Sequence, residues 1–204
     1  MKQWIAAAAL AASLGLAAAA PAQATAALTV DGSGSLTGAT GVTIGSATYD
    51  VDFRDGSCFG LFGGCVTSAF AFHSSADAEA AAEALLAQVF INDGTHSFDT
   101  LPGKTEGCAG TAAFCDVLIP YDLLLGFSEV ATVVAINDAA EANDGTLAGF
   151  TPGTNADTAN LNFLTWAVFT PVSSVPEAST WAMMLLGFGG IGAALRRRKV
   201  AAPA

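Results

Sequence analysis

The side chains most often used in catalysis are scarce in this chain. It has two histidines, His73 and His96, among 204 residues. A nucleophilic triad could combine Ser74, His96 and Asp99, but no Gly-x-Ser-x-Gly elbow is present to expose a serine. The glycine-rich stretches also lack the lysine of a phosphate-binding loop. These observations predict that the protein is not an enzyme and needs no cofactor.

Acidic side chains offer a second kind of chemistry, because carboxylates bind calcium and act as acid and base in glycan hydrolysis. Asp50, Asp52 and Asp55 form the densest group. Asp50 and Asp52 alternate with apolar residues, so they are close neighbours on one strand face, which suits a cation better than an acid–base pair. These three are weak candidates for a metal site. Ordinary solvated carboxylates on a strand and turn are the simpler interpretation.

A second oxygen-rich group lies further along the chain. Its members are Asn137, Asp138, Asn143 and Asp144. Neither group has the spacing of an EF-hand loop, which requires alternate oxygen ligands, a glycine at the sixth position and a glutamate at the twelfth. Calcium binding therefore stays an alternative hypothesis.

The N-terminus has the three parts of a secretory signal peptide. Lys2 precedes an apolar region over 4–20, and Pro21-Ala22-Gln23-Ala24 follows it. A small-residue Ala-x-Ala site directly after the apolar region predicts cleavage after Ala24 rather than a permanent anchor. We therefore expect export into an oxidising compartment.

The four cysteines form two pairs with the same spacing, Cys58 with Cys65 and Cys108 with Cys115. Export favours two disulfides, and the equal spacing favours these local pairs, although the sequence also permits the two crossed pairings. Zinc is the competing interpretation. The six-residue gaps do not match the short gaps of zinc sites, and the histidines are not close in sequence.

Between the two ends of the chain, the pattern predicts one α+β domain of mostly antiparallel strands with one packed helix. The helix is expected over 76–90, with Ser74 or Ser75 as its N-cap. The glycine-rich first cysteine loop, with Phe59, Leu61 and Phe62, is expected to form a tight, partly buried knot, and 143–146 to form a turn. Strands are expected over 28–30, 42–44, 48–53, 66–72, 116–121, 129–136 and 161–170.

This central region is strongly acidic. Its basic side chains are Arg54 and Lys104, whereas 17 of the chain's 18 acids lie in it, Glu177 being the exception. Nucleic acid is therefore excluded as a partner, because binding it requires a cationic surface. An acidic polysaccharide would need divalent cations as bridges. Net charge of this kind also keeps an exported protein soluble.

The C-terminal segment combines a short polar stretch, an apolar run and a cationic cluster. Pro176 and Glu177 lie in the polar stretch, and 15 uncharged residues follow over 181–195. Such a helix spans about 22 Å, which is shorter than the roughly 30 Å of a bilayer core. The four cations Arg196, Arg197, Arg198 and Lys199 resist translocation. This pattern predicts a temporary membrane stop with Trp181 at the interface.

The order Pro-Glu, Trp-Ala-Met-Met, Gly-Phe-Gly and a terminal arginine cluster resembles the PEP-CTERM sorting tail in its Trp-Ala variant. The third motif position is Ala178 rather than proline. The resemblance implies an exported protein of a Gram-negative bacterium. It also implies recognition by an exosortase, an integral membrane enzyme that cuts near Pro176 and Glu177 and releases the product to the surface or the exopolysaccharide matrix.

The expected organisation is a signal peptide over 1–24, an exported cargo domain over 25–174 and a sorting tail over 175–204. The expected function is that of a non-catalytic surface or matrix protein, which passes through an inner-membrane intermediate. A calcium-assisted carbohydrate-binding module is the alternative. An exported glycan hydrolase that uses Asp52 or Asp55 is a third hypothesis.

Overall fold

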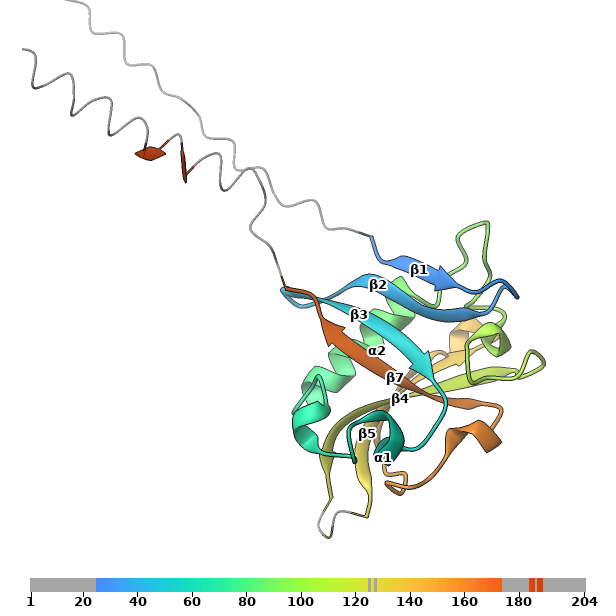
Figure 1. Cartoon of the computed structure of the whole chain (residues 1–204). Coiled ribbons are helices and arrows are strands. Elements are labelled where there is room, and N and C mark those ends of the chain that lie inside the picture. Colours follow the sequence, from blue (N-terminus) through green and yellow to red (C-terminus); the bar gives the residue numbers. More distant parts are fainter. Residues whose placement is uncertain (1–24, 125, 127, 174–183, 186, 189–204) are drawn as a thin grey trace, which may run out of the picture.

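The last strand of the domain lies at the centre of its sheet. In the computed structural model, which describes residues 25–124, 126, 128–173, 184–185 and 187–188, seven strands form one sheet in the order β1-β2-β3-β7-β4-β5-β6. All neighbours are antiparallel except β4 and β7 (Figure 1). The strands are β1 (Ala27–Val30), β2 (Leu36–Ile44), β3 (Ala47–Arg54), β4 (Phe114–Leu123), β5 (Val130–Asp138), β6 (Gly145–Phe150) and β7 (Leu164–Pro171).

Strand β3 shows how the sequence pattern sets the two faces of the sheet. Val51 and Phe53 are each 2% exposed, whereas Asp52 between them is exposed. The alternation arises because successive side chains of a strand point to opposite faces. The prediction of a strand at 48–53 is therefore confirmed, with one more residue at each end.

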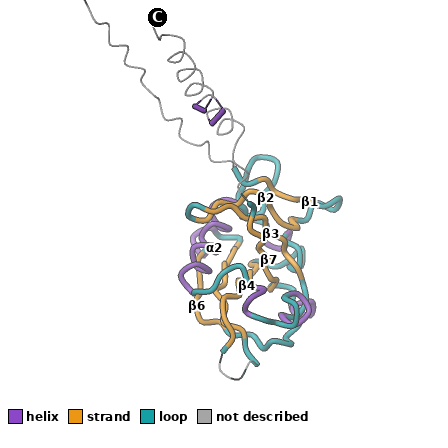
Figure 2. Tube along the Cα trace, turned by 60° about the vertical axis from the view of Figure 1, so that its left-hand side comes forward, coloured by secondary structure: helices purple, strands orange, loops and turns teal. Residues whose placement is uncertain are grey.

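Helix α2 (Ser75–Gln88) packs along one face of this sheet (Figure 2). Ser74 is its N-cap, and its hydroxyl accepts a hydrogen bond from the Asp77 N–H. Such a cap stabilises a helix by about 1 kcal/mol. At its other end the Gln88 side chain bonds to both backbone groups of Thr43 on β2. The predicted helix is confirmed, and it begins one residue earlier and ends two residues earlier than expected.

The other face is covered by a short helix, α1 (Cys58–Leu61), and the loop after it. Trp166 of β7 is fully buried there, and its ring packs edge-on against Phe62. The Trp166 indole N–H also donates to the carbonyl oxygen of Gly56 at 3.0 Å. The domain thus has two apolar layers, one on each face of the sheet.

Both cysteine pairs form the local disulfides that their spacing favours, Cys58–Cys65 and Cys108–Cys115. The first lies beside α1, and the second ties the start of β4 to the loop before it. Each closes a loop of six intervening residues, so each restricts the unfolded chain locally rather than linking distant elements.

Two expectations for local structure are wrong. The segment 66–72 is not a strand but contains a 3-10 turn at Thr67–Ala69, where all three residues are exposed. The expected turn at 143–146 contains the start of β6, in which three of the six residues are Gly or Ala, types that are depleted in strands. Pairing with β5, rather than local preference, gives β6 its conformation.

The expected signal peptide over 1–24 lies outside the described residues, and so does nearly all of the expected membrane helix over 181–195. In the part of the chain that the structure describes, no helix has the length and apolar character needed to span a bilayer.

Gly107 provides a test of how tightly the second disulfide loop packs on β7. Its φ is +87°, and a Cβ atom there would lie 2.5 Å from Thr165 Oγ1 and 2.8 Å from Asp55 Oδ1. We expect Gly107→Ala to lower the free energy of unfolding by about 2–4 kcal/mol, measured by urea denaturation. Gly34→Ala is the control, because Gly34 has a similar φ of +83° but its Cβ would meet no atom within 4 Å. Equal stabilities of the two variants would contradict this packing.

Candidate functional site

Ser74, His96 and Asp99, the residues considered as a nucleophilic triad, do not form one in the structure. The Ser74 hydroxyl donates to the Asp77 carboxylate at 2.7 Å at the start of α2. His96 Nδ1 lies 3.2 Å from Asp93 Oδ2, not beside Asp99. Backbone N–H groups of His96 and Thr95, with the His96 ring, hold the pKa of Asp93 at about 2. The Asp93 carboxylate therefore stays charged and organises a turn.

The carboxylates of Asp50, Asp52 and Asp55 have separate partners. Asp50 accepts the N–H of Gly41 at 3.0 Å, where a bulge interrupts the pairing of β2 and β3. Asp52 pairs with the exposed Arg54 at 3.1 Å. Asp55 accepts the Thr158 hydroxyl at 2.9 Å, which joins the end of β3 to a 3-10 turn before β7. Among the described residues, no group of three or more His, Cys, Asp or Glu side chains could hold a metal ion.

The second oxygen-rich group shapes the connection between β5 and β6. Asp144 accepts the Asp138 N–H at 2.7 Å, and Asp138 accepts the Ala140 N–H at 2.8 Å. Burial raises the pKa of Asp144, and the nearby charges of Asp99 and Asp138 act in the same direction. Asn137 faces the core, where its amide donates to the Phe98 carbonyl oxygen. The group therefore divides between a turn and the core.

Asp116 on β4 is an acid that the sequence interpretation missed. It lies opposite Ile136 of β5 and Leu164 of β7, and it is half-buried between these apolar neighbours. Burial raises the pKa of this carboxyl to about 6. The signal available in the sequence was an acidic residue in a strand whose other side chains are mostly apolar on both faces.

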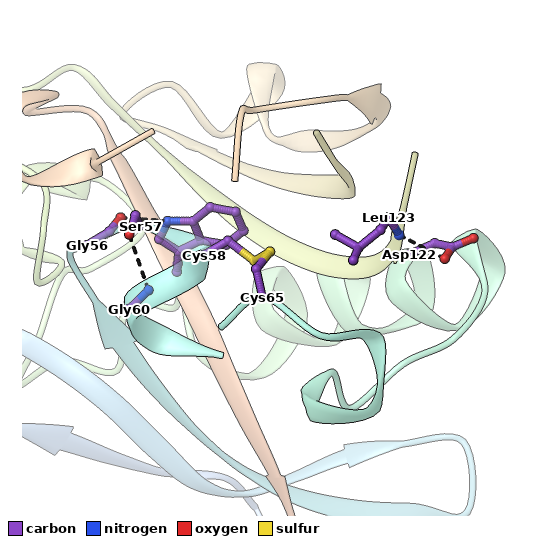
Figure 3. The surroundings of a disulfide bond; sticks show 8 residues. Gly56, Ser57, Cys58, Gly60, Cys65, Asp122 and Leu123 are labelled. Atoms are coloured by element: carbon purple, nitrogen blue, oxygen red, sulfur yellow. Dashed lines mark hydrogen bonds between the residues drawn. A yellow bond between two sulfur atoms is a disulfide. The ribbon is translucent and has the colours of Figure 1, made fainter. Parts of the chain in front are cut away.

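The first disulfide, drawn in Figure 3, lies beside a hollow at the surface, of which Cys65 forms part of the lining. Ser57 caps α1 by accepting the Gly60 N–H, and the Cys58–Cys65 bond returns the chain toward β4, where Leu123 lies. Phe59 was expected to be partly buried, but 59% of its surface is exposed at the edge of this hollow. The sequence could not locate the hollow, because three separate segments line it.

The two ends of the domain leave it at the same end of the sheet (Figures 1 and 2). Pro171 pairs with Tyr49, and the Val172 N–H donates to the Thr48 carbonyl oxygen at 2.8 Å. Pro176 is four residues after Val172. Four extended residues reach about 14 Å. The candidate processing residues therefore follow the folded sheet closely, although Pro176, Glu177, Trp181 and 196–199 lie outside the described residues.

Comparison with known proteins identifies the C-terminal segment. A family model described as the PEP-CTERM protein-sorting motif matches residues 174–199. No curated protein and no solved structure matches the chain.

The position of Asp116 predicts a pH-dependent effect on stability. Its folded-state pKa of about 6 is above its ordinary value of 3.8, so the folded state holds this proton more tightly than the unfolded state. The contribution of Asp116 to the free energy of unfolding should therefore fall as pH rises from about 4 to about 6, and Asp116→Asn should remove this loss. Because the carboxyl is half-exposed, we expect a gain of about 1 kcal/mol at pH 8 and none at pH 3.5.

Urea denaturation at the two pH values measures this gain. Glu83→Gln is the control, because it removes an exposed helix carboxylate and the same unit of charge. A difference between Asp116→Asn and wild type that does not change with pH would contradict the assigned burial.

Proposed function

Because the chain carries a PEP-CTERM sorting motif, we propose that it is an exported, exosortase-processed, non-catalytic protein of the cell surface or extracellular matrix. The motif at 174–199 is the single observation that carries this proposal. The domain over 25–174 is the cargo, and the motif is the sorting signal that exosortase recognises.

The sorting steps follow from the order of the segments. The signal peptide over 1–24 directs the chain to the export machinery and is removed after Ala24. The apolar run over 181–195 then stops in the inner membrane, with Trp181 at the interface and Arg196, Arg197, Arg198 and Lys199 on the cytoplasmic side. Exosortase cuts near Pro176 and Glu177 and releases the domain.

The described domain supports this route in two ways. Its two disulfides require the oxidising conditions that an exported protein meets. Its two chain ends leave from one end of the sheet, so the domain can hang from the membrane by that end without blocking its far end.

A non-catalytic role agrees with how the candidate side chains are used. Ser74 caps a helix, Asp93 and Asp138 organise turns, and Asp55 braces β3 against the segment before β7. These side chains therefore have local structural roles, although three other acids, Asp99, Glu141 and Asp144, line a hollow near the end of α2. In the described part of the chain no carboxylate group fits a metal ion, so no observation favours the calcium-assisted alternative.

Substitution of the motif tests the proposal directly. We expect Glu177→Ala to block cutting, so that the precursor accumulates in the membrane and the surface product falls at least about tenfold, as for loss of a specific recognition group. Fractionation and immunoblotting of the native host measure both forms. Glu141→Ala removes an exposed acid from the domain and should be processed normally. Equal amounts and masses of surface product from wild type and Glu177→Ala would refute exosortase processing.

The short connection between sheet and motif gives a second test. Deleting Ser173 and Ser174 leaves one residue, Val175, between Val172, which is bonded to β3, and Pro176. Pro176 is then the second residue after Val172, so the extended reach falls to about 7 Å. We expect slower processing in a pulse-chase experiment, because the folded sheet then crowds the enzyme. Inserting Gly-Ser after Ser173 is the matched control and should not slow processing. Equal rates for deletion and insertion would show that the connection does not limit cutting.

A further inference from the structure

A hollow of about 480 Å³ lies beside the first disulfide, and three segments line it. Helix α1 contributes Phe59 and the segment after it contributes Thr67. The end of β4 contributes Leu123, and the segment after β6 contributes Thr154 and Asn155. The lining is therefore part apolar and part hydroxyl and amide. None of the described residues that line it carries a charge.

The walls of this hollow are fixed by covalent and backbone bonds. The Phe59 N–H donates to the Thr154 carbonyl oxygen at 3.0 Å, so α1 is tied to the opposite wall. The Thr154 N–H in turn donates to the Ser128 carbonyl oxygen at 2.9 Å. Cys65 is held by its disulfide at a φ of +59°, which is costly for a residue with a side chain. A ligand would meet a surface that is already in place.

The exposed ring of Phe59 decides what kind of ligand fits. Its exposed fraction of 59% leaves the aromatic surface open beside the hydroxyls of Thr67 and Thr154 and the amide of Asn155. A pyranose ring has an apolar C–H face that can lie on an aromatic ring, and hydroxyls at its edge that pair with such polar groups. We propose that this hollow binds a neutral glycan, with one sugar ring stacked on Phe59.

The alternatives explain the lining less well. An apolar protein segment would cover Thr67, Thr154 and Asn155 and leave their polar groups without partners, which is unfavourable. An acidic or basic ligand would find no opposite charge among the lining residues. A calcium-bridged glycan would require carboxylates, and none lines the hollow. The site therefore differs from calcium-assisted carbohydrate binding.

The hollow is also well placed for a surface protein. It includes the C-terminal end of β4, which pairs parallel with β7 but diverges from it, so that this end lies apart from the point where both chain termini leave (Figures 1 and 2). The outward orientation rests on the proposed sorting, but binding by the purified chain does not. Loss of binding and loss of processing can therefore be told apart.

The test is a titration of the full chain in detergent micelles with four neutral hexasaccharides. The probes are cellohexaose, laminarihexaose, maltohexaose and β-1,6-linked N-acetylglucosamine hexamer, followed by calorimetry. We expect saturable binding of at least one probe that is unchanged by EDTA and by high salt. Phe59→Ala should weaken it about tenfold, as expected for loss of one stacked aromatic ring. In saturation-transfer spectra, protons on one face of the sugar should receive the strongest transfer.

Leu147→Ala is the matched control, because Leu147 is an apolar residue of similar exposure, 51%, that does not line the hollow. Asn155→Ala should also weaken binding, and as an exposed residue it should leave the fold intact. Lack of saturable binding across all four probes would overturn the proposal, as would equal affinities of wild type and Phe59→Ala. Binding that EDTA abolishes would instead indicate a calcium-dependent site elsewhere. Glu177→Ala should bind as wild type does, which separates this site from sorting.

Discussion

The fold depends on the insertion of β7 between β3 and β4. On one side β7 pairs with β3 over six positions, from Tyr49 with Pro171 to Arg54 with Trp166, and on the other it pairs with β4. Without β7, the sheet order leaves β1 to β3 and β4 to β6 as two separate three-stranded units. Trp166 joins them further, because its buried ring packs on Phe62 while its N–H bonds to Gly56 after β3. The central element of the domain is thus the last to be synthesised.

This order of synthesis links the folding of the domain to the sorting motif that follows it. A chain exported from its N-terminus presents β7 only when the segment directly before the sorting motif has crossed the membrane. If the membrane holds the tail as proposed, the sheet can then close before the domain is released. Because Val172 is bonded to Thr48, the closed sheet lies a few residues from Pro176. In this account, all seven strands can pair before exosortase cuts the chain. Release therefore follows folding rather than preceding it.

The features that the sequence predicted are those set by local interactions. The alternation in β3, the capped alanine-rich helix and the two short disulfide loops each depend on residues close in sequence. The features that it missed depend on distant partners. Strand β6 takes its conformation from β5, Asp116 is buried by Ile136 and Leu164, and the hollow at Phe59 needs Leu123 and Thr154 as walls. In the sequence, Asp50, Asp52 and Asp55 form one group of carboxylates. In the structure, each has a different partner, because a bulge lies near the first and the end of β3 lies at the last.

The central claim is that this chain is an exosortase substrate, and the intact mass of the native product tests it most directly. Protein recovered from the outer surface and medium of the native host should begin at Thr25 and end between Pro176 and Ala178, with or without an added group at the new end. Two disulfides should lower its mass by that of about four hydrogen atoms. A product that retains residues 181–204 would contradict the account and identify a membrane-tethered protein instead.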